Sequence, residues 1–446
     1  MQDFFDNIHR RGLVGRRDFL RFISLSAAGV LAGCAANPVT GKSELMLISE
    51  SQEINIDRKN SPHQFSSDYG ITQDRALNDY INRTGKRLAA ISHRPYMPYS
   101  FQVVNATYVN AYAFPGGSIA VTRGILLKLR NEAELAGLLG HELGHVNARH
   151  TARQMSKGML ALVLISGASI AAGTYAPGYD RLISQLGMIG AGALLASYSR
   201  ENEREADSLA MVYMVQAGYS SQGFVGLMDI LSSLFKRKFS AAELLFATHP
   251  MSDERYQTAV AAVRTKYRYA KNQPLYKERY MDNTANLRAI REAIEEMQKG
   301  EKQMRKQNYD KAQDHFQVAL KKAPNDYTAL VLMSKTMIAK KRYDSALRYA
   351  EEAKQVYPNE AQAHHLGGFI KIKKKQYEAA YEDFSRYEKL LPGNPNTLFF
   401  MGLSLEGMKR YREAAGTYCR YLRQVREGRY AQHAYRRLVQ WRYDCY

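Results

Sequence analysis

Residues 135–153, LAGLLGHELGHVNARHTAR, are the stretch that best predicts the fold and chemistry of this chain. They contain His141, Glu142 and His145 in the pattern HExxH. Because residues four apart share one face of an α-helix, both imidazoles can reach a single metal ion. Glu142 lies beside them, where it misses the metal but can take a proton from a metal-activated water. The alternative is a core helix whose two histidines only satisfy hydrogen bonds.

The residues around this motif also favour a helix. Asn131 followed by Glu134 resembles a capping box, and the leucines and alanines between 133 and 143 provide an apolar surface for burial. Gly144 leaves the histidine face uncrowded. We therefore expect a buried metal-binding helix that begins after Asn131.

A second acidic motif, SRENEREADSLA at 199–210, can complete the metal site. Glu203 and Asp207 are four apart and share a helical face, whereas Glu201 and Glu205 point to the other side. This geometry favours Glu203 as the third ligand and Asp207 as a carboxylate that orients a ligand histidine. Acidic residues at a helix start often only complement the helix dipole. Because this motif occurs together with HExxH, metal binding is the preferred interpretation.

Length and composition indicate a folded protein of two or three domains, with 446 residues of which 45% are hydrophobic. The net charge of +20 is compatible with nucleic acid, anionic lipid or acidic protein partners. No zinc-finger spacing, RNA-binding signature or glycine-rich phosphate loop occurs, so we expect no nucleic-acid partner and interpret the charge as a solvated basic surface. Cys419 and Cys445 can either pair or remain free thiols.

Residues 1–33 have the features of an export signal. Arginines precede a short apolar run at 22–33, which is too short to span a bilayer. The string GRRDFLRF resembles a twin-arginine signal. LAGC, ending at Cys34, resembles a bacterial lipobox, which implies cleavage before Cys34 and lipidation of its thiol. The two alanines that follow lack the aspartate associated with inner-membrane retention. We therefore expect an exported periplasmic protein, anchored by lipid to the outer membrane; an ordinary secretory peptide is the alternative.

Two helices and a small sheet are predicted before the metal helix. One helix begins near Ser49 and another covers 74–90. Segments 100–104 and 118–121 are typical of short strands on either side of the turn-forming NAYAFPGG. A strand here can expose an edge to which an extended peptide adds by backbone hydrogen bonds. Alternatively, it forms an ordinary hairpin that packs on the helix.

Residues 159–196 hold two apolar stretches rich in glycine and alanine, each about fifteen residues long. Each is short for a helix that crosses a membrane. We favour a soluble helical hairpin over the active site, with a membrane-facing hairpin as the alternative.

HELGH, EREAD, NAYAFPGG and the later THP at 248–250 together resemble the HtpX and prenyl-endopeptidase type of zinc metallopeptidase, most of all its BepA-type periplasmic members. The resemblance covers roughly 38–256. The resemblance implies one Zn²⁺ per chain. It also implies that His141, His145 and Glu203 are the zinc ligands and that Glu142 is the general base. In BepA-like members a loop histidine can occupy the fourth zinc position and hold the enzyme closed. His249 stands at that place; a histidine that only lines the cleft is the alternative.

The chain beyond 280 contains a repeat of 34 residues. Tyrosine, alanine, proline and a small residue recur in one register: Tyr309, Tyr343, Tyr377, Tyr411; Ala312, Ala346, Ala380, Ala414; Pro324, Pro358, Pro392; Gly300, Ser334, Gly368, Gly402. This is the tetratricopeptide period, in which small residues let paired helices pack. We expect four repeats, the first with a degenerate first helix, and a cap at 430–441. The repeats form either a binding solenoid or a structural spacer.

Together these features predict a mainly α protein. After a signal peptide at 1–33, an α+β zinc metallopeptidase core at 34–280, with a small sheet and the HExxH helix, precedes an all-α tetratricopeptide solenoid at 281–446. The expected function is zinc-dependent cleavage of misfolded or stalled periplasmic and outer-membrane proteins in extended form. The repeats would recruit substrates or the outer-membrane assembly machinery. The alternative is a periplasmic adaptor or chaperone whose zinc site is mainly structural.

Overall fold

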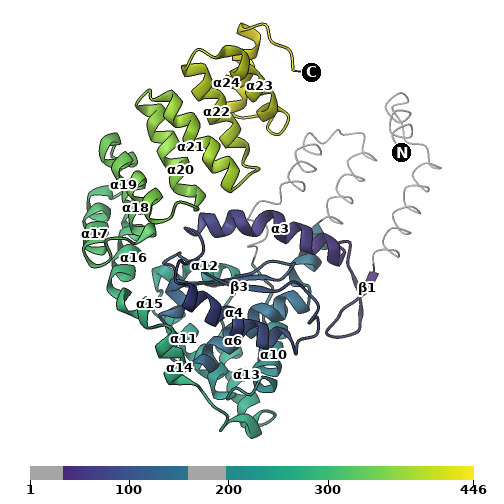
Figure 1. The fold of residues 1–446 in the computed structure, drawn as a ribbon. Helices are drawn as coiled ribbons and strands as arrows, with labels where there is room; N and C mark the ends of the chain where they lie inside the picture. The colour runs from purple at the N-terminus through teal and green to yellow at the C-terminus, as the bar shows by residue number, and fades with distance from the viewer. Residues whose placement is uncertain (1–33, 159–196, 446) are drawn as a thin grey trace, which may run out of the picture.

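The computed structural model describes residues 34–158 and 197–445 (Figure 1). Its N-terminal part consists of a small sheet with helices packed around it, and its C-terminal part is a stack of helix pairs. The elements of the first part are β1 (Cys34–Ala36), β2 (Ser43–Leu45), α3 (Glu50–Ser67), α4 (Arg75–Ala89), β3 (Ser100–Val104), β4 (Ala111–Ala113), β5 (Ser118–Thr122), α5 (Arg123–Leu126), α6 (Glu132–Asn147), α10 (Arg200–Gln216), α11 (Gln222–Lys236), η1 (Ser240–Ala242), α12 (Glu243–Thr248), α13 (Asp253–Arg264), η2 (Arg268–Ala270), α14 (Lys277–Asn283) and α15 (Ala285–Ala289).

The sheet beside α6 has the strand order β3-β5-β4. β3 runs parallel to β5, and β4 runs antiparallel to it, with Tyr112 opposite Ala120. The two predicted strands are present as β3 and β5, but they do not form a simple hairpin. Part of NAYAFPGG, which lies between them in the sequence, forms β4 at the edge of the sheet. In the described part of the chain the outer edge of β4 pairs with no other strand. Peptide addition at this edge stays a prediction.

Helix α6 is the centre of the first part, and every one of its residues is buried. The side chain of Asn131 caps it by accepting a hydrogen bond from the Glu134 backbone N–H at 2.9 Å. The reciprocal half of the predicted capping box is wrong. The Glu134 carboxylate instead accepts from the backbone N–H of Arg130 at 2.6 Å and from its Nε at 2.8 Å.

The close packing of α6 against α10 depends on two glycines. A Cβ atom at Gly144 would lie 3.1 Å from the Cα atom of Ala206, and one at Gly140 would lie 3.2 Å from that of Ala210. Both distances are tighter than ordinary van der Waals contact. The glycines therefore let the backbones of the two helices approach, which brings the acidic first turn of α10 to the histidines of α6.

The second part contains the predicted tetratricopeptide pairs. Its helices are α16 (Arg291–Arg305), α17 (Tyr309–Lys322), α18 (Tyr327–Ala339), α19 (Tyr343–Val356), α20 (Ala361–Lys373), α21 (Tyr377–Leu390), α22 (Pro395–Gly407), α23 (Tyr411–Leu422) and the capping α24 (Arg429–Gln440). Each repeated tyrosine begins the second helix of a pair. The first helix of the first pair, α16, was expected to be degenerate in its repeat pattern, and it is a complete helix of 15 residues. It forms because Ile294 and Met297 are fully buried against the rest of the core.

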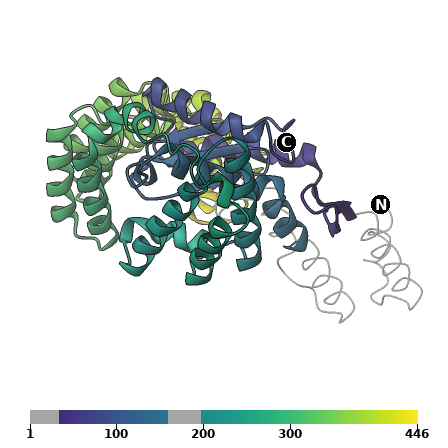
Figure 2. The same cartoon turned by 90° about the horizontal axis from the view of Figure 1, so that it is seen from below.

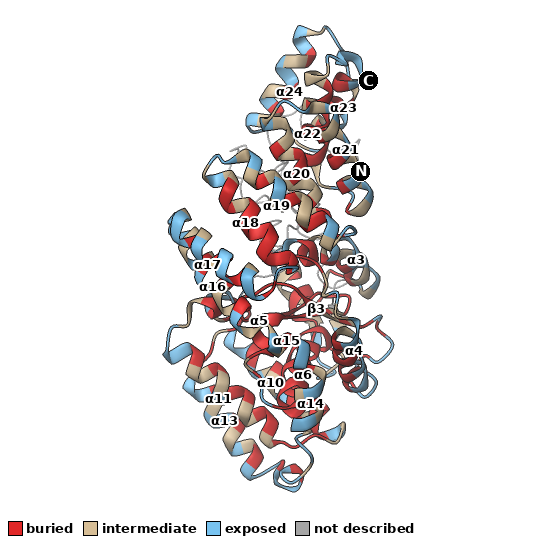
Figure 3. Cartoon of the chain, turned by 60° about the vertical axis from the view of Figure 1, so that its left-hand side comes forward, coloured by how far each residue is buried: buried red, intermediate tan, exposed pale blue. Residues whose placement is uncertain are grey.

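The repeats pack directly on the first part, along one side of it in the view from below (Figure 2). Nη1 of Arg123 lies 2.5 Å from Oδ2 of Asp326, and Ser66 donates a hydrogen bond to Glu360. A single apolar cluster includes buried residues of both parts, and Figure 3 shows the buried surface of α18 at this junction. The division at residue 280 stays a prediction.

Cys419 and Cys445 form a disulfide, which ties the segment after α24 back to α23. The predicted signal at 1–33 and the predicted apolar hairpin at 159–196 lie outside the described residues. Of the helices within 34–158 and 197–445, none combines the length and apolar composition required to cross a bilayer.

Candidate metal centre

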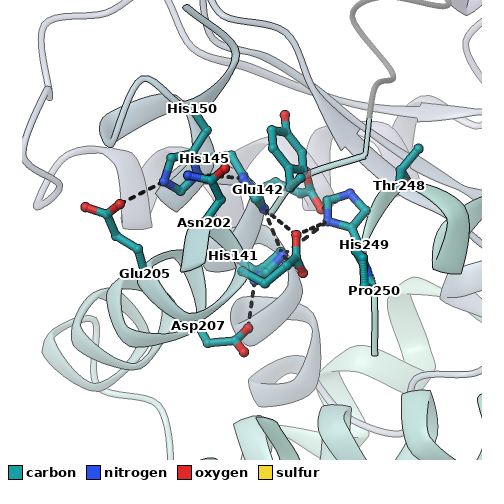
Figure 4. Close-up of polar contacts among 12 residues, drawn as sticks. His141, Glu142, His145, His150, Asn202, Glu205, Asp207, Thr248, His249 and Pro250 are labelled. Atoms are coloured by element: carbon teal, nitrogen blue, oxygen red, sulfur yellow. Dashed lines mark hydrogen bonds and ion pairs between the residues drawn. The ribbon is translucent and has the colours of Figure 1, made fainter. Parts of the chain in front are cut away.

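Four buried side chains bring their donor atoms within 4.8 Å of one another: His141, His145, Glu203 and His249. The Nε2 atoms of His141 and His145 are 3.0 Å apart, and Oε1 of Glu203 lies 3.4 Å from Nε2 of His145. His249 approaches from the C-terminal end of α12, where its Nδ1 lies 3.0 Å from Oε1 of Glu203 (Figure 4). The structure thus brings together the three predicted ligands and His249, the loop histidine for which the sequence left ligation open.

The start of α10 places Glu203 in this group. Ser199 caps the helix by accepting a hydrogen bond from the backbone N–H of Asn202, and the Asn202 side chain accepts in return from the Ser199 backbone. Glu203 follows in the first helical turn and is fully buried. The polar start of this motif therefore has a capping role as well as supplying a candidate ligand.

Asp207 lies behind the histidines as predicted. Its Oδ1 is 2.9 Å from Nδ1 of His141 (Figure 4). Arg255 of α13, which the sequence interpretation missed, donates to both oxygens of Asp207 at 2.7 Å. Its Nη1 also lies 2.6 Å from Oε2 of Glu203. The available signal was that two carboxylates four residues apart, on one face of a helix that packs against the core, require a cation nearby.

His150 is the second residue that the sequence interpretation missed. Its Nδ1 lies 2.8 Å from Nδ1 of His145, and its Nε2 lies 2.9 Å from Oε2 of Glu205. Glu205 points away from the four donor atoms, as predicted, but it contacts the group through His150. The signal was a further histidine directly after the HExxH helix.

The electrostatics favour the metal-binding forms of two of these residues, Glu203 and His145. Burial alone would raise the pKa of Glu203, but the imidazoles of His249 and His141 outweigh it and hold that pKa well below its usual range. Burial lowers the pKa of His145 well below its usual value. An ionised carboxylate and a neutral imidazole are the forms that bind a metal ion.

Glu142 lies beside these donors without joining them. It is 1% exposed, and burial raises its pKa, although His249 and His141 oppose that effect. Among the described residues, its Oε2 has no hydrogen-bond partner. A buried carboxylate with a free oxygen next to a metal site can accept a proton from a reacting water.

The donor set fits Zn²⁺. Two imidazoles and one carboxylate are a common ligand set of catalytic zinc, which keeps a fourth position for water or substrate. Here the imidazole of His249 lies with the other three donors, so these residues could hold an ion either with or without His249.

Known proteins with similar sequences identify the family. Residues 75–263 match peptidase family M48, and residues 303–367 match the tetratricopeptide repeat. The chain is 37% identical over 181 residues to the metalloprotease YcaL of Escherichia coli, a match that covers 40% of this chain and 68% of YcaL. The chain belongs to peptidase family M48. This membership and the repeats confirm the resemblance predicted from HELGH and EREAD.

Two further relatives match over a smaller part of their length. The chain is 31% identical over 199 residues to the beta-barrel assembly-enhancing protease of Yersinia pestis, covering 42% of this chain and 39% of that protein. It is 27% identical over 220 residues to the mitochondrial metalloendopeptidase OMA1 of Arabidopsis thaliana, covering 48% and 41%. The match thus spans about two fifths of each of these relatives.

Proposed function

We propose that this M48 protein is a zinc-dependent metalloendopeptidase. In it, His141, His145 and Glu203 hold the ion, and Glu142 is the general base. The observation that carries the proposal is the convergence of these ligands from α6 and α10 within 4.8 Å, with the unpartnered oxygen of Glu142 beside them. The names of the relatives YcaL and OMA1 as metalloproteases support the same activity.

The residues divide the chemistry among them. When bound, Zn²⁺ supplies Lewis acidity, which polarises a scissile carbonyl and makes water more acidic. Glu142 accepts the proton of the attacking water on its carboxylate and delivers it to the leaving amine. Asp207 orients His141, while Arg255 holds both Asp207 and Glu203 in place.

Metal removal tests this activity. The purified zinc-loaded protein is expected to cleave unfolded casein. Stripping the metal with a chelator should abolish cleavage, because neither Glu142 nor the ligands alone can polarise the carbonyl. One equivalent of Zn²⁺ should restore cleavage. Cleavage that persists in protein shown by elemental analysis to be metal-free would overturn the proposal.

We also propose that His249 ligates zinc in the resting enzyme and holds the site closed. Its Nδ1 lies 3.0 Å from Oε1 of Glu203 and 3.4 Å from Nε2 of His141. The variant His249→Ala should keep its zinc and cleave casein several-fold faster, since substrate no longer competes with the imidazole. Thr248→Ser, a change at the residue before His249, serves as the matched control and should cleave casein as the unchanged protein does. Slower cleavage by zinc-loaded His249→Ala would contradict closure.

The proposed substrates are misfolded or stalled periplasmic and outer-membrane proteins, cut in extended form after recruitment by the repeats. The name of the Yersinia pestis relative, which refers to beta-barrel assembly, supports a link to the outer-membrane assembly machinery. The lipobox ending at Cys34 supports lipid anchoring in the periplasm. Cys34→Ala should move the protein from the membrane fraction to the soluble fraction; unchanged membrane attachment would argue against the anchor.

A periplasmic adaptor or chaperone is the second candidate function. It is favoured by the extent of the solenoid, which continues through α24 and whose earlier helices, up to α20, share a core with the first part. In that case the zinc site would only stabilise the fold. The two functions differ in whether Glu142 is needed in the cell.

A further inference from the structure

The backbone turns sharply between α6 and the next helical run, which begins at His150. Arg149 at this turn has φ +55°, a left-handed conformation that non-glycine residues rarely adopt. Its buried guanidinium holds the conformation by donating to Oε1 of Glu53 at 3.1 Å and to the carbonyl of Ile48 at 2.6 Å. As a result, His150 returns towards the last turn of α6 instead of continuing along its axis.

This return places His150 directly behind the candidate ligand His145. The side chain of His150 is fully buried, and the two rings meet at 71° with their centroids 4.9 Å apart. Nδ1 of each ring faces the other at 2.8 Å, and Nε2 of His150 faces Glu205, as Figure 4 shows. Tyr198 stacks on His145 with a centroid distance of 3.8 Å, which further restricts its ring.

The positions of the protons follow from these contacts. The carboxylate of Glu205 lies 2.8 Å from Nη2 of Arg153, and as an ionised group it can only accept hydrogen bonds. Nε2 of His150 therefore carries a proton, and Nδ1 of neutral His150 has a lone pair. That lone pair accepts the Nδ1–H of His145. The remaining lone pair of His145 is then on Nε2, the atom that faces Glu203 at 3.4 Å.

We propose that His150 and Glu205 are positioning residues that fix the tautomer and orientation of His145, so that its Nε2 is ready to bind the metal. His141 has a direct carboxylate, Asp207, on its own Nδ1. For His145, the ring of His150 lies between Nδ1 of His145 and the carboxylate of Glu205. Arg153 also binds Glu44 of β2 at 3.0 Å, which anchors this arrangement to the N-terminal hairpin. The inference rests on the proposed metal site.

Zinc affinity of the full chain tests this role, measured by competition with a fluorescent chelator at pH 7.5. His150→Phe keeps a ring but removes the acceptor, and we expect it to bind zinc about 10- to 100-fold more weakly, the effect typical of a lost partner behind a ligand histidine. His150→Asn can place an amide oxygen near the position of Nδ1, and it should recover most of the affinity. His365→Phe in the repeats, a ring replacement among aromatic neighbours, is the matched control.

The outcomes separate this inference from the proposed function. A folded His150→Phe protein that binds zinc as tightly as the unchanged chain would overturn the role of His150. Equal weakness of His150→Asn and His150→Phe would overturn the acceptor argument. If His150→Phe does not fold, Glu205→Leu replaces it and should weaken zinc binding several-fold; unchanged affinity would again refute the inference. Absence of zinc binding by the unchanged chain would instead contradict the proposed metal site.

Discussion

Glu142→Gln is expected to keep stoichiometric zinc and to lose casein cleavage by about 10²- to 10⁴-fold, the range attributed to a positioned general base. Glutamine has the same shape as glutamate but cannot accept the proton of the attacking water. Glu142 is not one of the four converging donors, so the ligands should be unaffected. Zinc content and initial cleavage rates, measured on the same preparations, check both parts of this expectation.

Glu243→Gln, an exposed change at the start of α12, is the matched control and should behave as the unchanged protein. Cleavage at the normal rate by zinc-loaded Glu142→Gln would refute the role of the base. The same variant decides between protease and adaptor in the cell. We expect it to rescue a deletion phenotype only in part, whereas full rescue would favour the adaptor.

The candidate ligands could be named from the sequence because their relations are local. Within α6 and within α10, the helical repeat alone places His141 with His145 and Glu203 with Asp207. The 34-residue period likewise predicts the repeats. The helical repeat does not predict that α6 and α10 pack against each other. That packing depends on close backbone contacts such as the one between Gly144 and Ala206.

Arg255 and His150 were missed for a different physical reason. Arg255 reaches Asp207 across 48 residues of chain, and only the packing of α13 brings it there. His150 is close in sequence, but continuing the helix would direct it away from His145. Its actual position depends on the left-handed backbone of Arg149, which neither residue type nor hydrophobic spacing indicates. β4 was missed similarly, because a strand of three residues has too little pattern to predict.

Arg255 supports His141 through Asp207, and His150 supports His145 directly. Among the candidate ligands, we expect zinc binding to be most sensitive to substitution of Glu203. Glu203 supplies the only carboxylate among the four donors, and Arg255 holds its other oxygen at 2.6 Å. In Glu203→Gln a neutral amide replaces the charged ligand at equal volume, while Arg255 keeps both contacts to Asp207. The fold should therefore survive better than after truncation to alanine.

Glu203→Gln is expected to lose zinc by more than the roughly 10- to 100-fold caused by changes behind a ligand. Casein cleavage should fall with it. In the unchanged protein, zinc at about 100 times its Kd should stabilise the fold by about 2.7 kcal/mol and raise the thermal midpoint of unfolding. In Glu203→Gln, zinc should no longer raise that midpoint. Glu201→Gln, an exposed change in the same helical turn, should retain zinc, cleavage and the thermal shift. A folded Glu203→Gln protein with full zinc and normal cleavage would remove Glu203 from the site, and with it the convergence of α6 and α10 on which the peptidase mechanism depends.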